Sequence, residues 1–297
     1  MNVAVVGTGI MGGHIARRLA QAGFAVTGWN RSAHKLAALP GVRASDDLRV
    51  TLAAADTVIV MLSGGPVIDE LLFAGGAQAP VRAMRASSQL VVMSSVPVAT
   101  ARAQAAAVAP LGIQYLDAPV SGGEPGARDG TLAIMVGAAR DAFAGAAPVF
   151  APLGRATLLG PVGSGQLAKL ANQVIVGGTL VAIAEALTLV ARGGADPAAV
   201  REAWMGGFAD SKVLRVLGQR MVDGNFEPGS PAAYQLRDMR AAAAQAHELG
   251  LKLDQLNRVI EQFGALERSG EVERDVSIVI REVERSAQLA QRAGRAA

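Results

Sequence analysis

The chain has 297 residues, of which 51% are apolar and 18% are charged, and this balance excludes an intrinsically disordered protein. The net charge is +3, but the basic residues are spread along the chain and aromatic residues make up only 4%, so a nucleic-acid-binding protein is not indicated. Cysteine is absent, which excludes disulfides and thiolate chemistry, and the three histidines do not stand at metal-ligand spacing. We therefore expect a globular protein without a metal site.

Residues 2–32 have the pattern of a strand, a glycine turn, a helix and a second strand. The apolar run 3–6 predicts a buried parallel strand, and a GxGxxG pattern precedes the predicted helix 14–22. In such a turn the first glycine allows the tight bend, the second allows a pyrophosphate to approach the backbone, and the third allows the helix to pack on the strand. The N-terminus of the helix attracts the anion. The predicted cofactor-binding residues of this turn are Gly7, Gly9, Ile10, Met11 and Gly12.

The predicted second strand, 25–30, ends in Asn30, Arg31 and Ser32. An NAD site usually has an acidic residue here, which binds the adenosine ribose. Arginine instead binds phosphate through two parallel hydrogen bonds, whereas a carboxylate would repel it. The three residues therefore predict a preference for NADP(H), with NAD(H) as the second cofactor. In the alternative interpretation, Arg31 only caps an exposed strand end.

Strands and helices alternate through the rest of the first half. The pattern predicts strands at 42–44, 57–62, 89–94, 114–116, 132–136 and 157–159, and helices at 47–54, 67–73, 99–108 and 140–150. This order indicates an α/β fold with a Rossmann-type doubly wound sheet, in which ligands bind at the carboxyl ends of the strands. The further cofactor-binding candidates near those ends are Met61, Leu62, Ser63 and Ser95.

From Gly163 onward only helical periodicity remains. It predicts helices at 166–192, 197–205, 211–222, 232–249 and 253–268. We expect a nucleotide-binding domain at 1–162 and an all-α substrate and oligomerisation domain at 163–297. The long helix that starts near residue 166 would join them, with the active site in the crevice between.

The stretch 174–191 is nearly as long and apolar as a membrane span. Glu185 lies inside it, however, and Gly177 and Gly178 suit close helix packing. We therefore predict a helix buried between two domains, and no membrane association. The N-terminus begins directly with a core strand and has no basic leader, which predicts a cytoplasmic protein.

Two segments of the chain carry candidate chemistry. In the first, Ser121, Gly122 and Gly123 follow a predicted strand, and their N–H groups could hold a carboxylate in a backbone nest. A plain glycine-rich turn is the alternative for this segment.

The second segment is the glycine-rich approach to the long helix, where Gln166, Lys169, Asn172 and Gln173 share one face. A lone lysine on a helix usually points into solvent. A lysine that shares one face of an apolar helix with amide side chains is instead expected to point into a cleft. Burial would lower the pKa of Lys169 from about 10.4, so that it could exchange a proton with a substrate oxygen while Asn172 binds that oxygen.

Four motifs occur in an order and spacing that resemble the β-hydroxyacid dehydrogenase family: GTGIMG, DAPVSGG, GSGQLAKLANQ and LRD. The resemblance covers nearly the whole chain. It implies that Lys169 is the catalytic acid and base, that Ser121, Gly122 and Gly123 bind the substrate carboxylate, and that Asn172 orients the substrate. It also implies that Arg237 and Asp238 lie near the cofactor and the substrate. The family usually has lysine at the position of Arg237, and the two side chains are not geometrically equivalent.

The resemblance implies a dehydrogenase or reductase acting on CH–OH groups, with reversible hydride transfer between the nicotinamide and a small aldehyde acid or hydroxy acid. The expected substrates are 3-hydroxyisobutyrate, tartronate semialdehyde, glyoxylate or succinic semialdehyde, and the expected assembly is a homodimer or homotetramer. An imine reductase and a non-catalytic NADP-binding regulator are the alternatives. Lys169 argues against both, and a 6-phosphogluconate dehydrogenase would need a larger helical domain.

Overall fold

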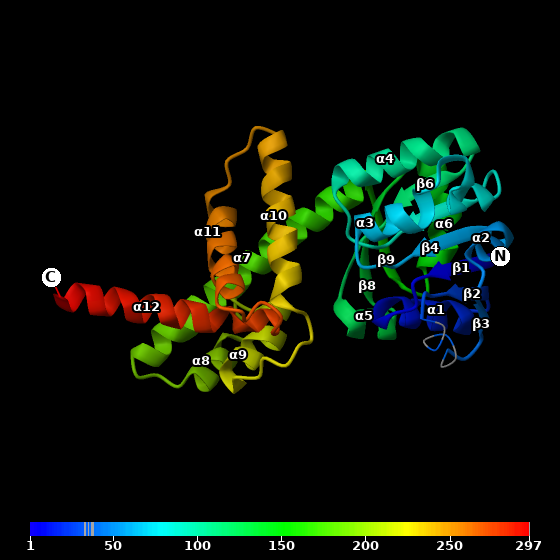
Figure 1. The fold of residues 1–297 in the computed structure, drawn as a ribbon. Helices are drawn as coiled ribbons and strands as arrows, with labels where there is room; N and C mark the ends of the chain where they lie inside the picture. Colours follow the sequence, from blue (N-terminus) through cyan, green and yellow to red (C-terminus); the bar gives the residue numbers. More distant parts are fainter. Residues whose placement is uncertain (33, 35, 37–38, 297) are drawn as a thin grey trace. The chain divides into compact units, whose positions relative to one another are not determined.

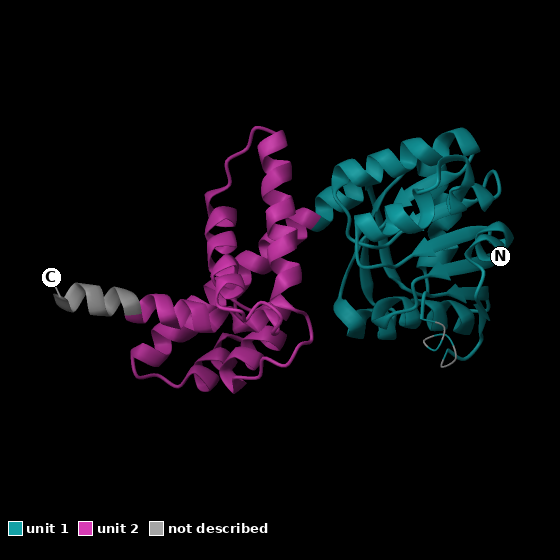
Figure 2. Ribbon diagram, viewed as in Figure 1, with its two compact units in different colours: residues 1–169 teal, residues 170–297 magenta. Residues whose placement is uncertain are grey.

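The structure is a computed structural model that describes residues 1–32, 34, 36 and 39–296 (Figure 1). Its contacts divide the chain into two compact units, Met1–Lys169 and Leu170–Ala297 (Figure 2). Among the described residues, two apolar clusters lie in the first unit and one lies in the second. The domain boundary between residues 162 and 163 stays a prediction.

The strands of the first unit form one sheet in the order β3-β2-β1-β4-β5-β6-β8-β7, and β9 pairs with β8. Strand β1 runs parallel to β2 and β4, whereas β8 runs antiparallel to β6 and β7. The chain therefore reverses its direction of winding between β1 and β4, where dinucleotides bind in such sheets. The strands are β1 (Asn2–Val6), β2 (Ala25–Trp29), β3 (Val42–Ser45), β4 (Thr57–Val60), β5 (Gln89–Val92), β6 (Gln114–Asp117), β7 (Val120–Ser121), β8 (Leu132–Gly137) and β9 (Gly154–Gly160).

Helices cover both faces of this sheet (Figure 1). Val3 and Val5 of β1 pack in one apolar cluster with helices α1, α5 and α6, and the alternate residues Ala4 and Val6 pack in the other with α2 and α4. The predicted doubly wound sheet is thus confirmed. The helical segments are α1 (Ile10–Gln21), α2 (Leu48–Ala54), α3 (Gly65–Ile68), η2 (Asp69–Phe73), η3 (Gly76–Gln78), η4 (Pro80–Ala83), α4 (Val98–Val108), η5 (Ala109–Leu111), α5 (Gly123–Asp129) and α6 (Arg140–Phe150).

The second unit is helical, as predicted. Leu180, Ala184 and Leu187 of α7 are buried in a core that they share with α10 and α11, and these two helices lie side by side (Figure 1). Helix α12 was not predicted. The helical segments of the second unit are α7, which begins in the first unit (Ser164–Arg192), α8 (Pro197–Trp204), η6 (Leu214–Gly218), α9 (Gln219–Asp223), α10 (Ala232–Glu248), α11 (Asp254–Arg268), η7 (Val276–Ile278) and α12 (Val279–Ala296).

Helix α7 is long and apolar enough to cross a membrane by length and composition. In the structure, 39% of its most apolar 18-residue window is buried. Leu180, Val181 and Leu187 in this stretch belong to the core of the second unit. Such packing is typical of a core helix, which passes the same test of length and composition.

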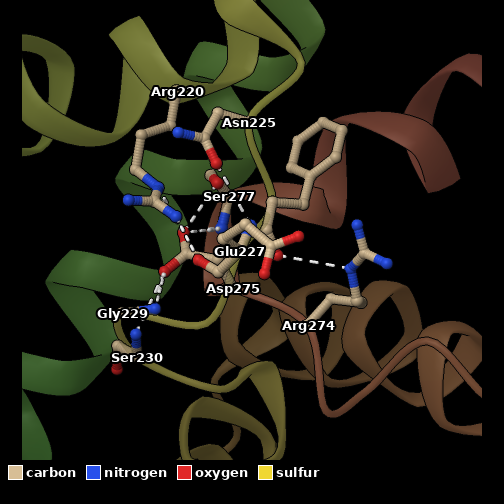
Figure 3. A network of polar contacts seen from close by, with 9 residues as sticks. Arg220, Asn225, Glu227, Gly229, Ser230, Arg274, Asp275 and Ser277 are labelled. Atoms are coloured by element: carbon tan, nitrogen blue, oxygen red, sulfur yellow. Dashed lines mark hydrogen bonds and ion pairs between the residues drawn. The ribbon is translucent and has the colours of Figure 1, made fainter.

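A buried carboxylate organises the segment that precedes α10 (Figure 3). Asp275 is 1% exposed, and its Oδ2 accepts hydrogen bonds from the backbone N–H groups of Gly229 and Ser230 at 3.1 and 3.0 Å. Its Oδ1 accepts the hydroxyl of Ser277 at 2.7 Å and lies 3.2 Å from Nε of Arg220. These bonds hold the loop before α10 against the start of η7.

Candidate active site

The glycine turn after β1 has the geometry expected of a pyrophosphate site. Gly7 has φ 95°, and its N–H group donates to the carbonyl oxygen of Trp29 at 2.9 Å. A Cβ atom on Gly9 would meet no described atom within 4 Å, so a ligand can approach this backbone, whereas a Cβ on Gly12 would overlap the carbonyl oxygen of Gly7. Helix α1 then begins at Ile10, which is 70% exposed, with no acidic residue in its first turn. The turn therefore fits the diphosphate of a dinucleotide.

The residues predicted to select the cofactor lie next to this turn. Asn30 directly follows Trp29, which accepts the hydrogen bond from Gly7. Asn30 and Ser32 are half-buried, and Arg31 is exposed. The guanidinium of Arg31 can therefore reach a negatively charged group in solvent beside the end of β2.

The other predicted cofactor residues follow β4 and β5, whose carboxyl ends lie at the same edge as that of β1. The N–H group of Met61 donates to the carbonyl oxygen of Val6 at 2.9 Å, and that of Leu62 donates to the hydroxyl of Ser94 at 2.8 Å. Ser63 is exposed, and Ser95 is half-buried. The structure thus places these residues on the β4 side of the reversal, and the backbone of Met61 lies directly against Gly7 of the glycine turn.

The segment predicted to bind a carboxylate lies between β7 and α5. Ser121 pairs with Ala133 of β8, and Gly122 and Gly123 have φ values of 138° and 64°, a region that favours glycine. Helix α5 was not predicted, because its first residues include two glycines and Pro125. It packs beside α1, where His14 Nε2 and Glu124 Oε1 are 3.2 Å apart. The segment predicted to bind a carboxylate therefore continues into a helix that contacts α1, the helix after the glycine turn.

Lys169 lies near the start of α7, three residues after Gln166. Lys169 is half-buried, and Gln166, one turn earlier, is only 1% exposed. The side chain of Gln166 does not share the solvent-facing surface: its Nε2 donates to the carbonyl oxygen of Ser94 at 2.9 Å, and its Oε1 accepts from the N–H group of Val96 at 3.1 Å. Gln166 therefore anchors the helix that carries Lys169.

Asp117 is the first residue of the DAPVSGG motif, but sequence reasoning gave it no role. It is fully buried at the end of β6, and its carboxylate accepts the N–H groups of Gly163 and Gln166, each at 2.8 Å. Burial raises the pKa of Asp117 above its ordinary value, while these N–H groups lower it by a smaller amount. The available signal was an acidic residue directly after an apolar strand.

In the second unit, hydrogen bonds connect three of the predicted residues. Asn172 Nδ2 donates to Gln173 Oε1 at 3.0 Å, and Gln173 Nε2 donates to Asp238 Oδ2 at 3.1 Å. Arg237 Nη2 donates to the other oxygen of Asp238 at 2.9 Å. Gln235, which was not predicted, donates to the carbonyl oxygen of Gln173 at 3.1 Å. Asn172, Arg237 and Asp238 thus belong to one polar network between α7 and α10.

Two family models match the chain. The NAD binding domain of 6-phosphogluconate dehydrogenase matches residues 2–163, and the NAD-binding region of NADP-dependent 3-hydroxyisobutyrate dehydrogenase matches residues 163–283. Together they cover most of the sequence.

Named relatives agree with these matches. The chain is 39% identical over 287 residues to 2-hydroxy-3-oxopropionate reductase of Escherichia coli K12, covering 96% of this chain and 97% of the relative. It is 35% identical over 204 residues to 3-hydroxyisobutyrate dehydrogenase of Pseudomonas aeruginosa, covering 68% of each. The crystal structure of 3-hydroxyisobutyrate dehydrogenase from Salmonella typhimurium superposes with a TM-score of 0.84 at 27% identity, covering 95% of this chain and 99% of that one. The chain therefore belongs to the β-hydroxyacid dehydrogenase family and is an oxidoreductase of the nicotinamide-dependent type that acts on CH–OH groups.

Proposed function

We propose that this enzyme reduces a small aldehyde acid with NADPH, and that 2-hydroxy-3-oxopropionate, which is tartronate semialdehyde, is the substrate to test first. The observation that carries the proposal is the position of the half-buried Lys169 near the start of α7. The buried side chains of Asp117 and Gln166 attach this part of the helix to the strand ends by hydrogen bonds. The choice of substrate is supported by the 39% identity to the E. coli reductase over nearly the full length of both chains.

The bound nicotinamide would supply the hydride to the carbonyl carbon of the substrate. In the proposed mechanism, protonated Lys169 donates a proton to the carbonyl oxygen as it becomes an alcohol, and the neutral amine removes that proton in the reverse direction. Asn172 orients the same oxygen. The N–H groups of Ser121, Gly122 and Gly123 bind the substrate carboxylate, with Arg237 as a further substrate ligand. These groups fix the geometry of the reacting atoms.

The proposed preference for NADPH rests on Arg31 at the end of β2. An exposed guanidinium suits the 2′-phosphate of NADP, and no acidic residue occupies positions 30–32 to repel it. Gly7, Gly9, Ile10, Met11 and Gly12 would hold the diphosphate. Asp238, together with the residues after β4 and β5, remains a proposed cofactor ligand.

A panel assay on the purified enzyme tests this function. NADPH or NADH oxidation is followed with tartronate semialdehyde, glyoxylate and succinic semialdehyde, and cofactor reduction is followed with 3-hydroxyisobutyrate. We expect the highest kcat/KM for an aldehyde acid with NADPH. A cyclic imine is the comparison substrate, and faster turnover of the imine than of any acid would contradict the proposal.

A further inference from the structure

The first turn of α7 is bound to the sheet by a carboxylate from another element. Asp117, the last residue of β6, accepts the N–H group of Gly163 at Oδ1 and that of Gln166 at Oδ2. These N–H groups belong to the start of a helix, where the backbone has no intrahelical acceptor for them. Asp117 is fully buried and therefore fixes the helix start without competition from water.

Close packing leaves little freedom at this junction. A Cβ atom on Gly165 would lie 2.8 Å from Asp117 Oδ2 and would overlap the carbonyl oxygen of Met135 in β8. A Cβ on Gly137 would overlap Asp117 Oδ1. The helix start, β6 and β8 therefore touch backbone to backbone, and a shift of the helix would break both hydrogen bonds to Asp117.

Gln166 connects the same turn to the strand ends where the cofactor residues lie. Its side-chain amide bonds to the backbone of both Ser94 and Val96, on either side of the cofactor candidate Ser95. The hydroxyl of Ser94 in turn accepts the N–H group of Leu62, another cofactor candidate. A connected set of buried and partly buried hydrogen bonds thus runs from the loop after β4, through the end of β5, to α7.

Lys169 follows Gln166 by three residues, which is nearly one turn of the helix. We propose that Asp117 and Gln166 are positioning residues that set the place of the Lys169 amine relative to the cofactor-binding strand ends. This inference rests on the proposed function, in which Lys169 moves a proton. All of these residues belong to the first unit.

The variant Gln166→Leu tests the inference, because it removes both side-chain hydrogen bonds. We expect kcat for aldehyde reduction, measured at saturating NADPH, to fall about 10- to 100-fold, since a displacement of about 1 Å can have that effect. The matched control is Gln104→Leu. Gln104 is also buried, and its amide bonds to Asp69 and to the hydroxyl of Tyr115, each at 2.7 Å, far in sequence from α7.

Loss of stability alone would affect both leucine variants, so their melting temperatures are compared with their kcat values. The inference predicts that only Gln166→Leu loses kcat in the temperature range where both remain folded. Asp117→Asn places an amide donor among backbone donors, and it should show the same loss of kcat. Equal effects of Gln166→Leu and Gln104→Leu on kcat would overturn the inference.

A double-mutant cycle separates positioning of Lys169 from an independent role. Single-turnover NADPH oxidation is measured for Gln166→Leu in the native chain and in a Lys169→Ala background. If Gln166 acts through Lys169, its replacement has no further effect once the amine is gone. An equal loss in both backgrounds would refute positioning while leaving the proposed function intact.

Native turnover in Lys169→Ala alone would instead contradict the proposed function, and the positioning inference with it. If Gln166→Leu does not fold, Gln166→Met enters the same cycle. Methionine is unbranched and adaptable, so it fills the space of the glutamine while removing both of its side-chain hydrogen bonds. We then expect a loss of kcat that again disappears in the Lys169→Ala background.

Discussion

Gly12 packs so tightly against Gly7 that a Cβ atom on Gly12 would overlap the backbone carbonyl oxygen of Gly7. Gly9 lies between them in the sequence, and a Cβ there would meet no described atom within 4 Å. Glycine is therefore required at the three positions of one motif for different physical reasons. Gly7 and Gly12 allow helix α1 to pack on the end of β1, whereas Gly9 leaves the backbone accessible from outside.

This difference predicts opposite results for two similar substitutions. Gly12→Ala should destabilise the fold by about 1 to 3 kcal/mol, because a backbone oxygen must move. Gly9→Ala should keep the native melting temperature but weaken NADPH binding, since its methyl group would occupy the side that the diphosphate approaches. Thermal unfolding and cofactor titration of both variants give the test. Native NADPH affinity in Gly9→Ala would show that the diphosphate binds elsewhere.

Local sequence patterns predicted the parts of the fold that depend on short-range order. The apolar run of β1 and the glycines after it identified the first βαβ unit, and alternation located the strands that follow. Helix α5 was missed because Gly122, Gly123 and Pro125 are typical of a turn. In the structure Gly122, at φ 138°, directly precedes the helix, and contact with α1 stabilises it. Tertiary packing outweighs weak helix propensity there.

The anchoring of α7 could not be predicted in the same way. Asp117 and Gly163 are 46 residues apart, and no periodicity relates them. The four polar residues of α7 were expected on one face, yet the structure directs Gln166 to Ser94 and Gln173 to Asp238. Spacing along a helix identifies which residues are neighbours, but the elements that pack against the helix decide what each side chain contacts.

The exposed Arg31 predicts how the enzyme discriminates between cofactors. Arg31→Ala should raise the dissociation constant for NADPH by about 10- to 100-fold, which corresponds to the loss of one charge-assisted contact with phosphate, and should leave that for NADH nearly unchanged. Arg43→Ala is the matched control, because Arg43 is also exposed, on the adjacent strand β3, where its guanidinium bonds to Thr27. Fluorescence titration with both cofactors measures the effect. Tighter binding of NADH than of NADPH to the native enzyme would contradict the proposed preference.

The nest at Ser121, Gly122 and Gly123 predicts that substrates must carry a carboxylate. Replacing the carboxylate of an active substrate by a neutral amide should lower kcat/KM about 10- to 100-fold, the range for hydrogen bonds to a charged group. Added salt should lower kcat/KM for the acid substrate and leave kcat/KM for the amide unaffected, because only the acid carries a charge that salt can screen. Steady-state kinetics on the matched pair decide the matter. Equal kcat/KM for acid and amide would assign the nest another role.

The half-buried Lys169 predicts a loss of chemistry without a loss of binding. Lys169→Ala should keep its fold and its affinity for NADPH, yet lose about 10²- to 10⁴-fold in kcat, the range for a positioned acid or base. Lys169→Arg should be nearly as slow, since a guanidinium stays protonated and cannot act as a base. The control is Lys212→Ala, which removes an exposed lysine of the second unit and should turn over at the native rate.

The same role fixes the direction of the pH dependence. Alcohol oxidation requires the neutral amine of Lys169 to accept a proton, so its kcat should rise with pH, whereas aldehyde reduction requires the protonated form and should decline at alkaline pH. Both slopes should disappear in Lys169→Ala, because the titrating group is gone. Rate profiles in both directions, measured with saturating substrate and cofactor, provide the test. If the profiles of Lys169→Ala keep the native slopes, another group moves the proton and Lys169 has no part in the reaction.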